Sequence, residues 1–563
     1  MKLIIREYLS LLKESNELDQ LLPDLLLAMD IEPISRTQTG VRQYGVDVAA
    51  VGIDEDGKKT LFLFTIKQGD IGRTDWDARE QSVRQSLDEI KDVYLTTHIL
   101  PEHKSLKKKI IVCTGGELKQ EVQLNWKGYV ERNSIAGKVE YDFWGGDKLS
   151  ILIEKYIFNE HLLPEKFRSK FRKTLSLLSD PDYNLSDYYN ILDELLIKPN
   201  YSNIDSQATQ KKIKKILRTV HLGLNIIIAW ARNEKNLKPA VYVAERTVLD
   251  TWEFLRRNNL FKKKAILSIF YEIYLMLFSL YAEYTKKIQK HCYLEDGLHI
   301  NGQHYLLECL NVFEQLGIVS LLGIAFVFQA FIEKNKSLMK SASAILNTIK
   351  ALIENHLSTR TPCYDNHIIE ISLSLYLLHI FNEKDFAKKW IEEIINHISF
   401  AYYQMGKYFP IWTDSFDDLV SLNISEQIDK EKMFEISTLI PILAQWCIVY
   451  DFKETYQIIS ETANKVFKNC TFQIWYPDNE TDKYLYIVNA AYKSGNVEAP
   501  ILLDDGFDKM RKIIEVVQTN TIKPDQISSI KYGFQILPMI ASRHFRTPML
   551  PFYWQKNVIE TKS

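Results

Sequence analysis

Chain-breaking residues are scarce in this sequence, whose 563 residues include only 21 glycines and 16 prolines. A collagen-like, mucin-like or repetitive low-complexity chain is therefore excluded. Aromatic residues, by contrast, are plentiful, with 30 tyrosines and 27 phenylalanines. Few chain breakers together with many large apolar side chains predict long, packed helices over most of the sequence.

Closely spaced cysteines and the common cofactor motifs are also missing. The sequence has no CxxC pair, and its six cysteines are far apart: Cys113, Cys292, Cys309, Cys363, Cys447 and Cys470. This spacing argues against a zinc ribbon or a disulfide scaffold and favours reduced, mostly buried thiols in a cytoplasmic protein. There is no Walker A loop, no GxGxxG after a strand, no HExxH and no GxSxG. The sequence therefore predicts no nucleotide cofactor, zinc proteolysis or serine hydrolysis.

Neither sign of charge dominates, because 70 basic and 72 acidic residues give a formal net charge of -2. Any nucleic-acid binding must then come from a local basic patch. Long apolar runs are rare as well, although residues 315–332 carry no charge and reach the lower length limit of a membrane span. Gln315, Ser320 and Gln329 interrupt this run, which favours a buried core helix. We predict a soluble, cytoplasmic protein, with a membrane-associated effector as the weaker alternative.

The first 160 residues differ in pattern from the rest of the chain. Leucines recur at three- and four-residue intervals between residues 9 and 26, which predicts a helix. Helical and strand patterns then alternate, and we expect strands at residues 45–52, 59–67, 109–114 and 138–143. Residues 1–160 are therefore predicted to form an α/β domain with a mixed sheet flanked by helices.

Strand signals almost vanish after residue 160, and helical patterns follow one another to about residue 545. We expect a basic helical linker over residues 161–220 and a large all-α sensor or scaffold region over residues 221–563. No convincing repeat at the spacing of helical solenoids is found. This helical region is the expected surface for homo-oligomerisation or for a partner protein.

The predicted hairpin of residues 45–67 brings polar side chains together. Its turn at Asp56-Gly57 sets Asp47 roughly opposite Thr65. Period-two alternation then places Thr65 and Lys67 on one face beside Asp47, whereas the other face, Phe62, Phe64 and Ile66, is expected to point toward the core. A carboxylate beside a lysine on rigid backbone suits a hard divalent cation and a water positioned for attack on phosphorus.

The order of these motifs resembles the PD-(D/E)xK nucleases, in particular the Mrr-like restriction endonuclease branch. Gly-Val-Asp47 followed by Thr65-Ile66-Lys67 resembles the core motif of that family. Gln81 and Gln85 lie on the next predicted helix, where this branch often carries a glutamine. The resemblance covers about residues 3–158 and implies a restriction-endonuclease-like fold and a metal-dependent DNA endonuclease.

The resemblance also implies roles for individual residues. Asp47 is the implied main ligand of Mg²⁺ or Mn²⁺, and Lys67 is implied to orient or activate the attacking water. The implied helical acid is Asp19, with Asp24 on the same helix as the runner-up. The carbonyl of Ile66 is an implied backbone ligand, and Gln81 and Gln85 complete the catalytic set.

One position departs from the family pattern. Thr65 stands where Glu or Gln is usual, which removes a carboxylate from the expected ligand set. Asp19 from the helix, or Asp70 or Asp75 just beyond the strand, would have to replace it. The alternative is a catalytically degenerate nuclease-like domain in a nucleic-acid- or protein-binding scaffold.

Basic residues in two places are candidates for contacting DNA. Arg36, Arg42 and Arg73 lie in the loops flanking the hairpin. A second candidate stripe in residues 165–173 contains Lys166, Arg168, Lys170 and Arg172. This stripe is equally typical of a solvated helix face whose phenylalanines pack inward. The fusion of a nuclease-like domain to a helical region without an ATPase resembles the effectors of bacterial anti-phage or restriction systems.

Overall fold

The computed structural model describes residues 1–35, 44–78, 82–158, 165–180, 183–201, 204–299, 304–406, 409–424, 431–487 and 495–548. The chain divides into two compact units, Met1–Ala240 and Val241–Ser563. The first unit thus extends beyond the predicted domain of residues 1–160 and includes the helices of the predicted linker.

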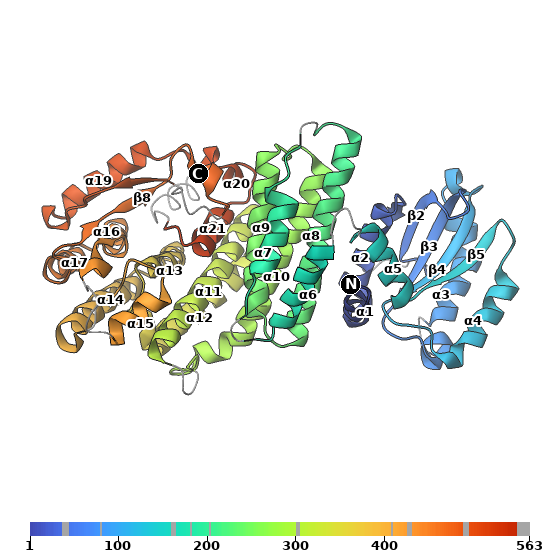
Figure 1. The fold of residues 1–563 in the computed structure, drawn as a ribbon, viewed down its shortest axis with the longest axis horizontal. Coiled ribbons are helices and arrows are strands. Elements are labelled where there is room, and N and C mark those ends of the chain that lie inside the picture. The colour runs from blue at the N-terminus through green and yellow to red at the C-terminus, as the bar shows by residue number, and fades with distance from the viewer. Residues whose placement is uncertain are drawn as a thin grey trace. The chain divides into compact units, whose positions relative to one another are not determined.

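A mixed, five-stranded sheet forms the centre of the described part of the first unit (Figure 1). Its strands follow the order β1-β2-β3-β4-β5, with the bounds β1 (Glu32–Ser35), β2 (Val48–Ile53), β3 (Lys59–Lys67), β4 (Lys107–Thr114) and β5 (Val139–Trp144). The first three strands are antiparallel neighbours, whereas β3, β4 and β5 run parallel. The predicted mixed sheet flanked by helices is confirmed.

The β2–β3 hairpin has the predicted register. Val48 pairs with Phe64 and Ile53 pairs with Lys59. The turn between them is closed by the Asp54 N–H, which donates to the Lys58 carbonyl over 2.9 Å. Gly57 within this turn has φ +77°, a conformation that glycine adopts without strain.

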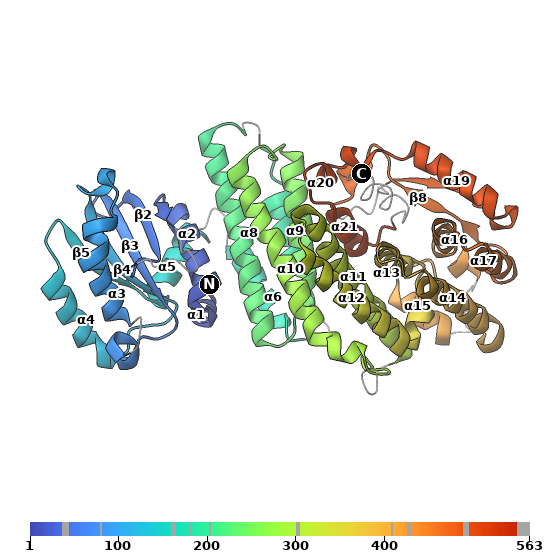
Figure 2. The same ribbon diagram turned by 180° about the vertical axis from the view of Figure 1, so that it is seen from behind.

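Helices cover both faces of the sheet (Figures 1 and 2). On one face, α3 (Val83–Glu89) and α4 (Gln120–Asn133) contribute side chains to a buried cluster with Leu61 and Leu63 of β3. The opposite layer contains α1 (Lys2–Leu11), α2 (Asp19–Ala28) and α5 (Gly146–Tyr156), which contact one another. Short π-helical segments join or extend these helices at Glu14–Leu18, Thr74–Ala78 and Ile90–His98.

Two details of the sheet differ from the sequence-based expectation. The strand β1 was not predicted; it contains Pro33 and lies at the sheet edge, where a strand can lack one N–H donor. Phe62, Phe64 and Ile66 of β3 are buried as expected, but the other face of the strand is buried too, because residues 60–66 are buried on both faces. This burial follows from the helices on both sides of the sheet.

Three further helices complete the first unit: α6 (Glu165–Leu177), α7 (Ser186–Leu192) and α8 (Gln207–Asn233). Phe167 and Phe171 of α6 are buried, and α8 likewise buries Ile213, Ile216 and Leu217. Both helices are therefore amphipathic.

The second unit is almost entirely helical, and the division from the first falls inside α9 (Lys238–Arg257). The longer helices that follow are α10 (Lys264–Cys292), α11 (Tyr305–Glu333), α12 (Lys336–Asn355), α13 (Ile368–Ile380), α14 (Lys384–Met405), α15 (Phe416–Ile424), α16 (Leu439–Tyr450), α17 (Lys453–Val466), α19 (Phe507–Asn520) and α21 (Leu537–Phe545). Short turns of helix form α18 (Thr481–Tyr484) and α20 (Ser528–Lys531). Helices α16 and α17 pack against each other as a helical hairpin.

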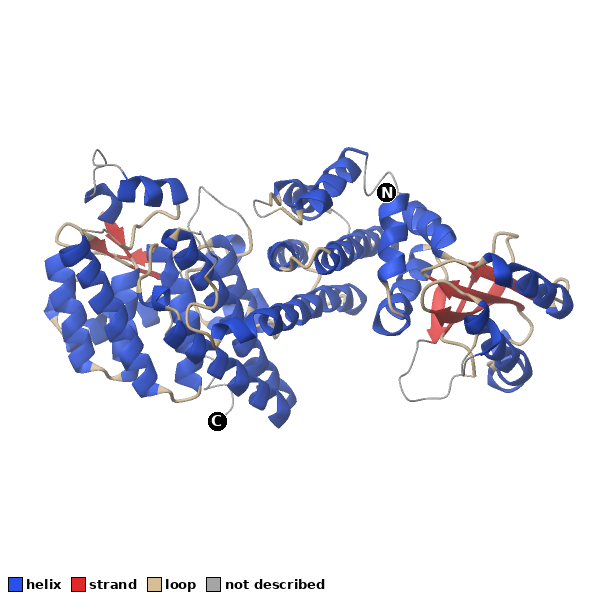
Figure 3. Cartoon of the chain, turned by 90° about the horizontal axis from the view of Figure 1, so that it is seen from below, coloured by secondary structure: helices blue, strands red, loops and turns tan. Residues whose placement is uncertain are grey.

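Four short strands interrupt this helical region, which the sequence analysis did not predict (Figure 3). Strand β6 (Ile436–Ser437) pairs with β7 (Thr471–Phe472), and β8 (Ile474–Tyr476) pairs with β9 (Asn496–Glu498). Strands of two or three residues are too short to show a period-two pattern in the sequence.

Two helices in the described part of the chain, α10 and α11, are long and apolar enough to cross a membrane. Helix α11 contains residues 315–332. Of its most apolar stretch of 18 residues, 72% is buried inside the protein. Its Ser320 hydroxyl lies 2.9 Å from that of Ser374 on α13. The burial agrees with the predicted core helix of a soluble protein.

Candidate functional site

The backbone at the start of β2 fixes the side chain of Asp47. Gly45 has φ +79°, and a Cβ atom at this position would lie 2.2 Å from the Ser86 carbonyl oxygen on α3, so only glycine fits. Two residues later, the Asp47 N–H donates to the Phe64 carbonyl over 2.8 Å. The Ile66 N–H in turn donates to Oδ2 of Asp47 over 2.7 Å. The carboxylate is thus held against β3 where the two strands part.

A π-helical turn aligns two more acids. The Asp19 N–H donates to the Glu14 carbonyl, five residues earlier, at the end of the segment Glu14–Leu18. In an α-helix, residues five apart lie about 140° apart around the axis. The wider π turn instead brings them close to one side of the helix. Glu14 and Asp19 are both partly exposed, and Figure 1 shows the start of α2 near the β2–β3 hairpin.

The electrostatic effects of four groups on one another show that they share one neighbourhood. Burial raises the pKa of Asp47 to about 6, the Ile66 N–H and the Lys67 ammonium oppose this rise, and Glu14 and Asp19 add to it. Burial also raises the pKa of Glu14, which Lys67 lowers and Asp19 raises further. Asp47, Lys67, Glu14 and Asp19 thus act on one another electrostatically, and we call this set of residues the acidic site.

Two oxygen atoms at the acidic site are buried without a hydrogen-bond partner among the described residues. They are Oδ1 of Asp19 and Oγ1 of Thr65. Thr65 is only 1% exposed and precedes Ile66, whose N–H contacts Asp47. Buried oxygens of this kind are normally satisfied by a protein group, by water or by an ion.

The acidic site has the donor types that a hard divalent cation prefers, although the carboxylate oxygens of Asp47, Asp19 and Glu14 do not all lie within 4.8 Å of one another. Burial is the main cause that raises the pKa values of Asp47 and Glu14, and neighbouring acids add to it. Carboxylate oxygens are the preferred protein ligands of Mg²⁺ and Mn²⁺. Asp47, Asp19 and Glu14 are the side chains that would hold such an ion, and the Ile66 carbonyl is available as a backbone oxygen.

Asp24, the runner-up for the helical acid, lies apart from this site. Its Oδ2 accepts a hydrogen bond from Nη1 of Arg218 over 2.7 Å and lies 3.6 Å from Nδ1 of His221. Both partners come from α8, and Asp24 is 8% exposed. The ion pair with Arg218 gives Asp24 a role in packing α2 against α8, and its role as a metal ligand stays a prediction.

The other predicted side chains around the hairpin do not join the acidic site. Gln85 is exposed on α3, because the residues of this helix that pack inward are Val83, Ser86 and Leu87. Asp70 accepts a hydrogen bond from the Glu117 N–H over 2.9 Å, and Asp75 accepts one from the Gly72 N–H over 3.1 Å. These two acids stabilise loops. Gln81, Arg36 and Arg42 lie outside the described residues.

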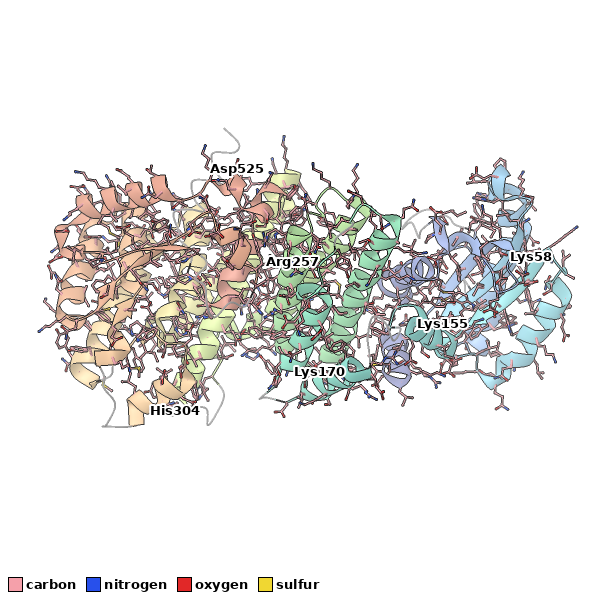
Figure 4. All side chains as sticks on the ribbon, turned by 45° about the horizontal axis from the view of Figure 1, so that its top comes forward. Lys58, Lys155, Lys170, Arg257, His304 and Asp525 are labelled. Carbon is pink, nitrogen blue, oxygen red and sulfur yellow. The ribbon has the colours of Figure 1, made fainter. Side chains whose placement is uncertain are left out.

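The predicted basic stripe on α6 divides into inward and outward residues. Arg168 turns inward, and its guanidinium donates to the Phe158 carbonyl over 3.0 Å and to Glu154 over 3.5 Å. Arg172 is exposed and Lys170 partly so, and Figure 4 shows Lys170 on α6. The side chain of Lys166 lies outside the described part of the structure. Arg73, in the loop after β3, is exposed.

Glu14 is the residue that sequence reasoning missed. A regular α-helix over residues 9–26 would place Asp19 and Glu14 about 140° apart around the axis, on different faces. The available signal was the density of acids in the segment Glu14–Leu18 and Asp19, directly before the leucine-rich turn. The π turn itself has no sequence signature that would have distinguished Glu14 from Glu17.

Comparison of the chain with models of protein families, with curated proteins and with solved structures finds no match. The fold and the site therefore define a class only in outline: a mixed α/β sheet domain with an acidic site at a hairpin, followed by a large helical region.

Proposed function

We propose that the first unit is a metal-dependent DNA endonuclease that hydrolyses phosphodiester bonds at the acidic site. The observation that supports this most is the shared neighbourhood of Asp47, Lys67, Asp19 and Glu14 where β2 and β3 part. The resemblance to the Mrr-like PD-(D/E)xK nucleases, drawn from the motif order, adds to the proposal. The helical second unit would act as a sensor, scaffold or oligomerisation surface, as in the effectors of bacterial anti-phage or restriction systems.

Each side chain has a defined task in this proposal. Asp47, kept in place by the Ile66 N–H, and Asp19, with its unpartnered Oδ1, hold the cation. A bound Mg²⁺ or Mn²⁺ supplies Lewis-acid polarisation of the phosphate and lowers the pKa of a coordinated water. Lys67 orients that water and stabilises the negative charge that develops on the phosphate.

Glu14 compensates for the missing carboxylate at position 65. Thr65 offers a neutral hydroxyl, whereas Glu14 reaches the same neighbourhood from the π turn beside Asp19. Magnesium in protein sites is usually held by one or two carboxylates, with waters and substrate phosphate completing its shell. Asp47 together with Asp19 or Glu14 would meet that requirement, so the threonine does not by itself exclude catalysis.

The proposal is tested by plasmid cleavage with Mg²⁺ or Mn²⁺ and with a chelator. We expect cleavage by the wild-type protein that the chelator abolishes, and a loss of about 100-fold or more in Asp47→Asn and Lys67→Met. Matched controls are Glu55→Gln and Lys58→Met, which change exposed residues in the turn of the same hairpin (Lys58 is labelled in Figure 4). Undiminished cleavage by both site variants would overturn the assignment.

Thr65 supports a second candidate, a binding domain without catalysis. Its buried hydroxyl replaces the acid that the family pattern requires. If the wild-type protein binds DNA or a partner protein, but neither binds a divalent cation nor cuts DNA, this second reading replaces the first.

A further inference from the structure

Two buried cysteines in the second unit lie in contact, although they are 54 residues apart in the sequence. The Sγ atoms of Cys309, on α11, and Cys363, in the segment between α12 and α13, are 3.0 Å apart. Cys309 also donates to the Thr361 carbonyl over 3.2 Å. This separation is about 1 Å longer than a disulfide bond of about 2.05 Å, so little movement would join the two sulfur atoms.

The pair lies close to the protein surface. Tyr305 precedes Cys309 by one helical turn and is 47% exposed, and the two thiols contribute to raising its pKa, after burial as the first cause. Leu357, at the start of the segment that carries Cys363, is 58% exposed. Two exposed side chains thus lie near the pair in the sequence, although both cysteines are themselves buried.

We propose that Cys309 and Cys363 form a reversible redox site, in which a hydroperoxide oxidises the two thiols to a disulfide. The thiolate of one cysteine attacks the peroxide oxygen, which gives a sulfenic acid and releases water or an alcohol. The second thiol then displaces the sulfenic hydroxyl as water and forms the S–S bond. The two thiols lose two electrons and two protons, and the peroxide takes up both.

The small fraction of reactive thiolate limits the rate of this reaction. The hydrogen bond from Cys363 to Cys309 and the burial of the pair raise the pKa of the Cys363 thiol well above its ordinary value. Because the thiolate is the reactive form, oxidation is slow near neutral pH and becomes faster as the pH rises. The site thus responds to sustained oxidative conditions rather than to brief ones.

The disulfide would brace several helices of the second unit. The segment that carries Cys363 continues into Asp365, whose carboxylate accepts hydrogen bonds from Ser437 and from the Thr438 N–H at the start of α16. The Thr359 carbonyl in the same segment accepts from Nε1 of Trp390 on α14 over 3.2 Å. Joining this segment to α11 restricts a 54-residue loop of the unfolded chain, which stabilises the folded unit.

The test uses the full chain, reduced and then treated with hydrogen peroxide at neutral and at alkaline pH. Free thiols are alkylated under denaturing conditions, and peptides are mapped by mass spectrometry without reductant. We expect a cross-linked peptide containing Cys309 and Cys363, lighter by two hydrogens and restored by dithiothreitol, and a melting temperature raised by a few degrees. Complete alkylation of both residues after treatment at both pH values would overturn the proposal.

Two sets of variants keep this test decisive. Cys309→Ala and Cys363→Ala each remove one partner, so neither variant should form the cross-link or gain stability on oxidation. Cys292→Ala is the matched control, because Cys292 is also buried but its Sγ donates to the Ile288 carbonyl instead of a second thiol. A gain in melting temperature that persists in both partner variants would also contradict the assignment. The inference does not depend on the proposed nuclease function.

Discussion

In the second unit the carboxylate of Glu245 is surrounded by donors and cations, whereas in the first unit Asp47 is affected by burial, by the Ile66 N–H, by Lys67 and by two other acids. Glu245 accepts from the Tyr281 hydroxyl over 2.6 Å and from Arg543, and it lies 2.9 Å from Nδ1 of His544. Burial raises the pKa of Glu245, but Arg543 and His544 lower it below the ordinary value overall. The pKa of Asp47 is instead raised to about 6.

This difference distinguishes a buried charge that stabilises the fold, Glu245, from a charge that we propose to act in function, Asp47. A buried acid that is fully paired specifies how elements pack, because removing either partner leaves an uncompensated charge. Acids that crowd together with a single lysine raise one another's pKa values and are a typical feature of sites that bind a cation or a substrate. If the proposed function holds, the two units use acidic residues for different purposes.

The largest effect is expected from breaking the paired cluster. Glu245→Ala leaves Arg543 and His544 buried without their carboxylate, so we expect a loss of about 3–5 kcal/mol in the free energy of unfolding. Denaturant unfolding monitored by circular dichroism measures it. The control is Glu461→Ala, which removes an exposed pair with Lys465 at 3.9 Å and should cost less than about 1 kcal/mol. Equal losses of unfolding free energy in Glu245→Ala and Glu461→Ala would show that the buried ion pairs of Glu245 stabilise the fold no more than an exposed pair does.

The next largest effect concerns catalysis at the acidic site. Lys67→Met should lower plasmid cleavage by about 100-fold or more, which corresponds to about 2.7 kcal/mol in transition-state stabilisation. The same variant should fold normally, because Lys67 is partly exposed at the end of β3. Rate measurements at saturating metal, together with melting curves, separate the two quantities. A loss of stability that accounts for the loss of activity would contradict a catalytic role.

A smaller effect is expected in the pH dependence of stability. The pKa of Asp47 in the folded, metal-free protein is raised, so its contribution to stability is present below about pH 4 and is lost as the pH rises through about 6. Asp47→Asn removes this loss and should be more stable than the wild-type protein by about 1–3 kcal/mol at pH 8, but not at pH 4. Unfolding free energies at both pH values measure it, and a difference that does not change with pH would be the contradictory result.

The smallest effect is a change in metal affinity. Glu14→Gln should weaken Mn²⁺ binding by about tenfold, because one of three candidate carboxylates is lost. Glu7→Gln, an exposed position on α1, is the control and should bind as the wild-type protein does. Equal Mn²⁺ affinities in the wild-type protein and in both variants would show that Glu14 is not a ligand. No acid would then replace the carboxylate that is missing at position 65.

The sheet and the register of the hairpin could be predicted from the sequence because both depend on local rules. Valine-rich and aromatic runs alternate with period two, and Gly57 marks the turn, so Asp47 had to meet the residues around Thr65. These features require no knowledge of contacts between distant residues.

The remaining parts of the site depend on contacts that the local pattern does not contain. Asp24 is paired with Arg218, which lies 194 residues further along the chain, and Arg168 turns inward toward Phe158. The position of Glu14 depends on a π turn, whose spacing the α-helical period does not predict. Tertiary pairing and irregular helix geometry therefore limited the prediction of individual side chains more than that of the fold.

The central claim is that Asp47, Asp19 and Glu14 bind one divalent cation beside Lys67. Calorimetric titration of the metal-free protein with Mn²⁺, with and without DNA, tests this claim most directly. We expect binding by the wild-type protein and by Glu55→Gln, and its loss in Asp47→Asn. Binding by Asp47→Asn that equals that of the wild-type protein, or no binding by the wild-type protein in the presence of DNA, would contradict the account.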